Sequence, residues 1–154
     1  MAQTLIHRAA DKLQPFITKF LNDMLVEGKS SETDLSSRAY ELIFELNFVN
    51  ASLLLYVLPQ LDQQLKVEDL ETRSSAVQLL ARMFAAKDST LPSSYPHLFS
   101  AFLGRFKDVN HEIRIVMVQF AEHFIINQAD DKLLHSVTGK QRIAPLISTF
   151  IRRY

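Results

Sequence analysis

The chain has 154 residues, with 17 basic and 17 acidic side chains and no cysteine. This length is enough for a domain with a hydrophobic core, and the absence of cysteine excludes a disulfide framework and a thiolate metal site. The zero net charge gives no indication of nucleic-acid binding, because a domain that binds DNA is usually visibly basic. Only 3 glycines and 5 prolines occur beside many leucines and phenylalanines, a composition that favours an all-helical protein.

Apolar residues recur at helical spacing along most of the chain, and no segment alternates convincingly like a strand. The first helix is predicted over about residues 3–26 and the second over about residues 35–48. Asp34, Asp69 and Asn110 each precede a helical run and are expected to cap it. The later apolar stripes lie at 54–65, 77–84, 98–106 and 113–124.

The chain matches itself when it is shifted by about 41 residues. The segment QLKVEDLETR then falls on RFKDVNHEIR, so that a capping residue, a glutamate and an arginine coincide. A repeated helix pair of about 40 residues is typical of HEAT or armadillo solenoids, and Pro59, the cap and the arginine favour HEAT repeats. We therefore predict an all-α, right-handed HEAT-repeat α-solenoid of antiparallel helix pairs, forming a single segment over residues 1–154. The expected repeats are residues 5–48, 51–86 and 95–127, followed by a partial repeat at 132–154.

Polar residues in the loops and first turns of successive repeats are expected to lie along one edge of such a solenoid. They are Lys66, Glu71, Arg73, Lys87, Asp88, Arg105, Lys107, Glu112 and Arg114. The candidate partner-binding residues are the six cations Lys66, Arg73, Lys87, Arg105, Lys107 and Arg114. Within this set, Arg105, Lys107 and Arg114 are hypothesised to form a positive patch that faces an acidic segment of a partner. The favoured alternative for Arg73 and Arg114 is that each arginine binds its preceding loop, at Asp69 or Asp108, and only orders the stack.

The sequence predicts neither a catalytic site nor a metal site. The histidines lie on separate predicted elements, and no pair has the spacing of metal ligands beside a carboxylate. There is no glycine-rich phosphate loop and no nucleophile elbow, so we expect a protein that is not an enzyme and has no cofactor. No apolar run reaches the roughly 20 residues of a membrane span. The basic ending GKQRIAPLISTFIRRY suggests lipid-surface binding as a less favoured alternative to a core helix.

Three segments of the chain, in order, are similar to one known family. They are QPFITKFLNDMLVEGKSSETDLSSRAYELIFEL, LLLYVLPQLDQQLKVEDLETRSSAVQLLARMFAAKDS and FLGRFKDVNHEIRIVMVQFAEH. Together they resemble the sister chromatid cohesion regulators of the precocious dissociation of sisters protein five family, over roughly Leu5 to Gln128. Family members are much longer HEAT solenoids, so the chain is expected to be a fragment or a truncated product that matches part of their N-terminal half.

The resemblance implies a nuclear, non-catalytic scaffold that regulates cohesin on chromatin. Its implied partners are the kleisin subunit of cohesin and the releasing factor Wapl, and it would act together with acetylation of the cohesin ATPase subunits. Chromatin association would then run through cohesin, without sequence-specific nucleic-acid contacts and without a membrane. A generic HEAT-repeat adaptor unrelated to cohesin is the alternative interpretation.

Aromatic residues at helical spacing are expected to form the core, namely Phe84, Phe99, Phe102, Phe106 and Phe120. A short stack of repeats would nevertheless leave apolar faces at its ends without a neighbouring unit. Each Å² of apolar surface that stays in water forgoes about 25 cal/mol of burial. We therefore expect the isolated chain to be marginally stable or to self-associate.

Overall fold

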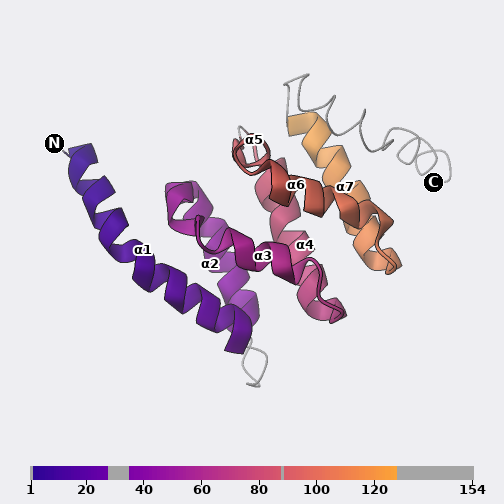
Figure 1. Cartoon of the computed structure of the whole chain (residues 1–154). Coiled ribbons are helices and arrows are strands. Elements are labelled where there is room, and N and C mark those ends of the chain that lie inside the picture. Colours follow the sequence, from indigo (N-terminus) through magenta and orange to yellow (C-terminus); the bar gives the residue numbers. More distant parts are fainter. Residues whose placement is uncertain (1, 28–34, 88, 128–154) are drawn as a thin grey trace. The chain divides into compact units, whose positions relative to one another are not determined.

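The computed structural model describes residues 2–27, 35–87 and 89–127, and this part of the chain is helical without a strand (Figure 1). The predicted all-α fold class is therefore confirmed. The chain divides into two compact units, Met1–Gln64 and Leu65–Tyr154, while the predicted repeat bounds stay predictions. The expected cap at Asp34, the edge residue Asp88 and the partial repeat at 132–154 lie outside the described residues. None of the described helices is both long and apolar enough to cross a membrane.

The first unit is built on two long helices that run in opposite directions, α1 (Ala2–Glu27) and α2 (Leu35–Asn50) (Figure 1). Both agree closely with the helices predicted over 3–26 and 35–48. They pack on each other and on the 3-10 helix η1 (Ala51–Leu54). The buried side chains are Leu21 and Leu25 on α1 and Ala39 and Ile43 on α2. On each helix they are four residues apart, about one helical turn, so each helix buries one face.

The apolar stripe at 54–65 does not form one helix, contrary to the simplest interpretation of its spacing. After η1 the chain turns and then enters the short helix α3 (Leu58–Gln64). Pro59 explains the break, because proline has no N–H to donate and restricts the residue before it, so it fits only in a first helical turn. The first turn of α3 is closed by the N–H of Leu61, which donates to the carbonyl of Val57 at 3.2 Å. At the other end of α3, the Tyr40 hydroxyl on α2 donates to Gln64 Oε1 at 2.9 Å.

The second unit contains two helices that lie side by side and run in the same direction, α4 (Leu70–Ala85) and α7 (His111–Asn127) (Figure 1). Between them the chain passes through α5 (Leu91–Ser94), α6 (Pro96–Leu103) and the 3-10 helix η2 (Gly104–Lys107). Helix α5 lies between the apolar stripes predicted at 77–84 and 98–106. It can form there because Pro92, like Pro96 in α6, lies in the first turn, where a missing N–H costs nothing.

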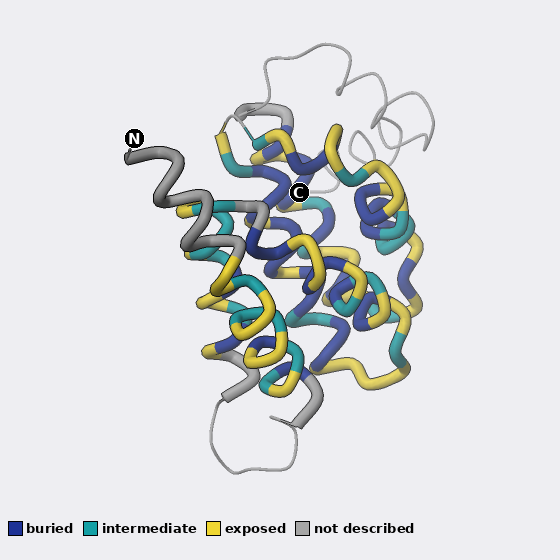
Figure 2. The backbone as a smooth tube through the Cα atoms, turned by 60° about the vertical axis from the view of Figure 1, so that its left-hand side comes forward, coloured by how far each residue is buried: buried dark blue, intermediate teal, exposed yellow. Residues whose placement is uncertain are grey.

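A closed circuit of ring contacts forms the core of the second unit. The ring centroids lie 5.0 Å apart for Phe84–Phe99, 5.8 Å for Phe99–Phe124, 5.2 Å for Phe124–Phe120, 4.8 Å for Phe120–Phe102 and 5.2 Å for Phe102–Phe84. The circuit joins α4, α6 and α7, and the buried positions of these helices alternate with exposed ones (Figure 2). All five phenylalanines predicted for the core are buried, and Phe124 joins them.

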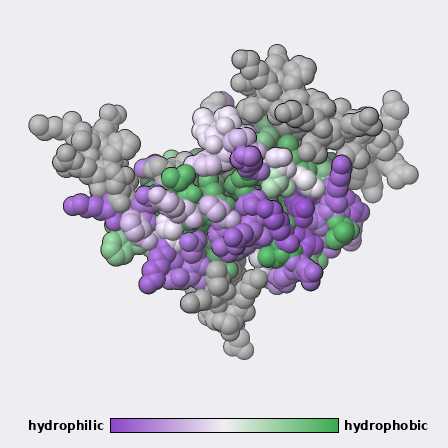
Figure 3. Space-filling view, in the orientation of Figure 1, coloured by the Kyte–Doolittle hydropathy of each residue, from purple (hydrophilic) through white to green (hydrophobic). Residues whose placement is uncertain are grey.

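Helix α1 also carries an apolar stripe that faces solvent. Leu13, Phe16 and Phe20 are 54%, 75% and 54% exposed, and their spacing of three and four residues places them on one helical face. Elsewhere, on the face seen in Figure 3, hydrophobic residues are interspersed among hydrophilic ones. If the isolated chain self-associates as expected, the exposed stripe of α1 is therefore the surface to test first.

Replacing Phe102 by alanine should lower the free energy of unfolding by about 3–5 kcal/mol, because it opens a cavity where two ring contacts of the circuit meet. Chemical denaturation followed by circular dichroism measures this change. Ile115→Ala on α7, at a side chain 43% exposed, is the matched control and should cost clearly less. Equal losses for the two variants would contradict the importance of the phenylalanine circuit.

The double substitution Phe16→Asp and Phe20→Asp should reduce concentration-dependent association of the chain, because it places charges on the exposed stripe of α1. Sedimentation velocity over a range of protein concentrations checks this. Val49→Asp on α2, where the side chain is 76% exposed but outside the stripe, should leave association unchanged. A wild-type chain that stays monomeric at high concentration would show that the stripe does not drive self-association.

Candidate functional site

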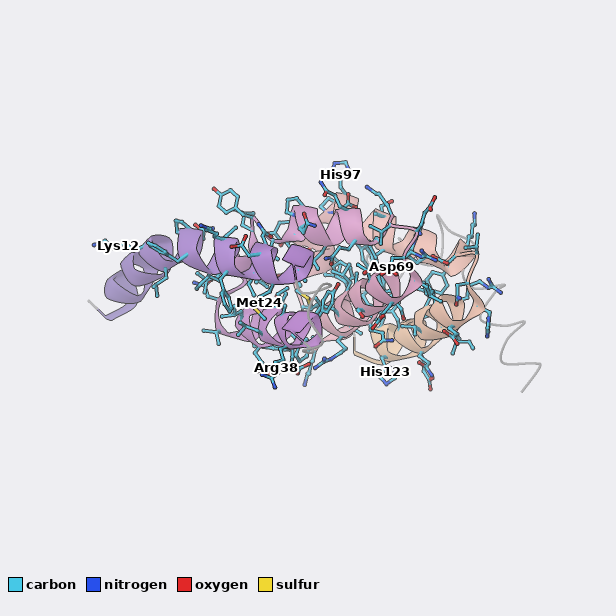
Figure 4. All side chains as sticks on the ribbon, turned by 90° about the horizontal axis from the view of Figure 1, so that it is seen from below. Lys12, Met24, Arg38, Asp69, His97 and His123 are labelled. Atoms are coloured by element: carbon cyan, nitrogen blue, oxygen red, sulfur yellow. The ribbon has the colours of Figure 1, made fainter. Side chains whose placement is uncertain are left out.

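The two loops that precede α4 and α7 are built in the same way, beginning with their capping residues. Asp69 Oδ2 accepts the N–H of Thr72 at 2.9 Å and also the Thr72 hydroxyl. Asn110 Oδ1 accepts the N–H groups of Glu112 at 2.8 Å and of Ile113 at 3.4 Å. Both side chains thus satisfy free N–H groups in the first turn of a helix, which confirms the two caps predicted here (Asp69 is labelled in Figure 4).

An arginine in the first turn of each helix reaches back and holds the loop. Arg73 and Arg114 each donate from Nη1 to two consecutive backbone carbonyls. The acceptors are Val67 O at 2.6 Å and Glu68 O at 3.0 Å for Arg73, and Asp108 O at 2.7 Å and Val109 O at 3.0 Å for Arg114. Each arginine thus binds its preceding loop, as the favoured alternative expected. Arg114 binds at Asp108, but through the backbone carbonyl, and Arg73 binds the carbonyls of Val67 and Glu68 rather than Asp69. We call this arrangement the carbonyl clamp.

The carboxylate of Asp108 connects the two loops. Its side chain is 1% exposed and accepts from Arg73 Nε at 3.1 Å and Nη2 at 3.4 Å, and from Arg105 Nη1 at 3.2 Å. The N–H of Asn110 adds a further bond to Oδ1 at 2.9 Å. A buried carboxylate of this kind is stable only because several donors replace the lost water.

Arg105 completes the connection from the side of η2. Its Nη1 also donates to the carbonyl of Leu65 at 3.0 Å, although the side chain remains 28% exposed. Arg73 and Arg105 are therefore engaged in holding α4, η2 and the two loops together. Lys66 and Lys107, which lie in the same two loop regions, are exposed.

The loops enclose a shallow, open depression of about 430 Å³, whose lining contains four cations and two carboxylates. It is lined by Lys66, Val67, Glu68, Arg73, Arg105, Lys107, Asp108 and Val109. The structure thus brings together four of the six predicted site residues. Lys87 follows the other end of α4, a helix about 24 Å long at 1.5 Å per residue, and Arg114 is exposed but does not line the depression.

His97 and His123, both described in the second unit, do not converge on a site (Figure 4). His97 on α6 and His123 on α7 point away from the helices on opposite sides (Figure 4). His123 Nδ1 lies 2.7 Å from the carbonyl oxygen of Gln119 on its own helix. Within the described ranges no group of three or more His, Asp or Glu side chains could hold a metal ion.

Four residues of the depression were not among the predicted site residues, namely Val67, Glu68, Asp108 and Val109. For Asp108 and Val109 the comparison of the repeats contains a signal that could have found them. Asp108 stands opposite Val67, and Val109 stands opposite Glu68, within segments that otherwise agree closely. A carboxylate at the first of these positions and an apolar side chain at the second distinguish the loop before α7. The sequence contained this difference, but spacing alone gave no reason to regard it as important.

Asp108→Asn should lower the free energy of unfolding by about 3 kcal/mol, because removing the negative charge leaves Arg73 buried without its ionic partner. Chemical denaturation measures the loss. Glu68→Gln, at an exposed carboxylate in the loop before α4, should stay within about 0.5 kcal/mol of the wild type. Indistinguishable stabilities for Asp108→Asn and the wild type would show that the carboxylate does not hold the two loops.

Comparison with known proteins places this arrangement in one family. The family described as "Sister chromatid cohesion protein PDS5 protein" matches residues 1–147 of the chain. Three relatives align with the chain over 130 residues, or 84% of its length. The PDS5 homolog B-A of Xenopus laevis and the PDS5 homolog B of Homo sapiens are each 45% identical to the chain, and the PDS5 homolog A-B of Xenopus laevis is 43% identical.

The aligned region covers only 9% of the two homolog B proteins and 10% of the homolog A-B protein. The chain thus spans about a tenth of the length of these relatives. The family match nevertheless covers nearly the whole chain, including both loops and the depression between them. The chain therefore belongs to the PDS5 family of sister chromatid cohesion proteins.

Proposed function

We propose that the chain is a non-catalytic scaffold segment that acts in sister chromatid cohesion in the nucleus. Membership of the PDS5 family supports the process, since the relatives are named as sister chromatid cohesion proteins. A scaffold role is supported by the polar groups around the depression. Arg73 and Arg105 bond to Asp108 and to backbone carbonyls, so they hold the walls of the depression in place. A surface fixed in this way presents side chains to a partner without reorganising.

The observation that carries the proposal is the exposed pair Lys66 and Lys107 at the depression. They add positive charge around a carboxylate that Arg73 and Arg105 already balance. A partner segment rich in Asp and Glu would complement this surface, and such complementarity increases both the association rate and the specificity of an interface. The partners that family membership suggests are the kleisin subunit of cohesin and a Wapl-type releasing factor, acting together with acetylation of the cohesin ATPase subunits.

Double charge reversal, Lys66→Glu with Lys107→Glu, should weaken capture of cohesin subunits and Wapl by the tagged full chain from a nuclear extract by about tenfold, because it turns attraction into repulsion. The wild-type interaction should also weaken as salt rises, since exposed charges are screened. Quantitative immunoblotting of the captured subunits measures both effects. Arg105 is left unchanged, because its bonds to Leu65 and Asp108 would confound binding with stability.

Lys87→Glu provides the matched control, since Lys87 is exposed but lies away from the depression. It should leave capture unchanged. The melting temperature of the double variant is measured alongside, so that a loss of stability is distinguished from a loss of binding. Equal capture by the wild-type chain and the double variant would exclude the depression as the partner surface. Absence of cohesin from the wild-type capture, with a folded chain, would count against a cohesin-binding role for this segment.

A further inference from the structure

Val109 lies in the loop between η2 and α7 and is 92% exposed, more than any other large hydrophobic residue in the described part of the chain. Single apolar residues on a protein surface are common and usually need no explanation. Val109 differs from them in two respects. Its backbone is held in place by hydrogen bonds, and it lines a depression that carries several charged side chains.

The backbone around Val109 is held on both sides. Its own carbonyl and that of Asp108 accept Arg114 Nη1 at 3.0 and 2.7 Å. The next residue, Asn110, donates its N–H to Asp108 Oδ1 at 2.9 Å and caps α7 with its side chain. The position of the valine is therefore set before any partner arrives, so binding loses less conformational entropy than it would on a loose loop.

The fold itself does not require an apolar side chain at this position. In the loop before α4 the equivalent residue is Glu68, whose carbonyl accepts Arg73 Nη1 at 3.0 Å, as the carbonyl of Val109 accepts Arg114. The glutamate side chain is exposed there. The carbonyl clamp thus forms with either residue, and folding gives no reason for the valine.

We propose that Val109 is the apolar anchor of the partner surface, and that it enters an apolar pocket on a protein whose rim carries Asp or Glu carboxylates. The carboxylates would meet Lys66 and Lys107, which line the same depression as Val109. This inference rests on the proposed function and specifies the shape of the partner as well as its charge. Burying a fully exposed valine strengthens binding by about tenfold or more.

A photoreactive residue in place of Val109, in the otherwise intact chain, identifies the contact. The chain carrying p-benzoylphenylalanine at this position is irradiated in nuclear extract, and the cross-linked peptide is identified by mass spectrometry. We expect one dominant peptide, from a cohesin subunit or Wapl, with apolar residues flanked by Asp or Glu. Cross-links no stronger than those from the same group at Ile115 on α7, or cross-links between two copies of this chain, would overturn the proposal.

The cross-linked partner protein is then purified, labelled and titrated with the full chain by fluorescence anisotropy. Val109→Glu, which copies Glu68 of the other loop, should raise Kd at least about tenfold without changing the melting temperature, and Val109→Ile should retain binding. Wild-type affinity in Val109→Glu, together with weaker binding in the Lys66→Glu, Lys107→Glu variant, would overturn the anchor and leave the proposed function standing. Unchanged affinity in both variants would overturn both proposals.

Discussion

The second unit depends on one buried charge, the carboxylate of Asp108. Two arginines from different elements donate to it, and the same arginines bind backbone carbonyls in the loop before α4. A carboxylate at this depth is costly unless each of its oxygens has donors, and here each oxygen has them. The loops, the caps and the depression all take their positions from this network, whereas the phenylalanine circuit supplies the apolar energy that holds the helices together.

The helices of the first unit and the core of the second were accessible from the sequence. The stripes of α1 and α2 are long and regular, so their bounds were predicted closely, and the five expected core phenylalanines are buried. Short elements were harder, because a proline can either end a helix or begin one. Pro59 breaks the stripe at 54–65 in favour of η1 and α3, whereas Pro92 begins α5 between two of the predicted stripes.

The sequence predicted a set of cations for the candidate site, but not how they are arranged or which groups they bond to. Arg73 and Arg114 were candidate partner-binding residues for which equivalent spacing favoured a structural role, and both hold the loop before their helix. Spacing could not show that Asp108 pairs with the arginine of the preceding repeat, at a sequence distance of 35 residues, because that contact depends on how α4 and α7 pack. Nor could it separate Arg105, which holds the walls, from Lys107, which faces solvent, since both carry the same charge.

The carbonyl clamp has a consequence for how such loops can change over evolutionary time. Each arginine recognises the main chain of its loop, and every residue offers a backbone carbonyl whatever its side chain. The side chain at the second clamped position is therefore not needed to form the clamp, and glutamate and valine occupy it in two loops of one molecule. A protein built from such units can acquire or lose a recognition residue at each loop by single substitutions, while the stability of the fold stays constant.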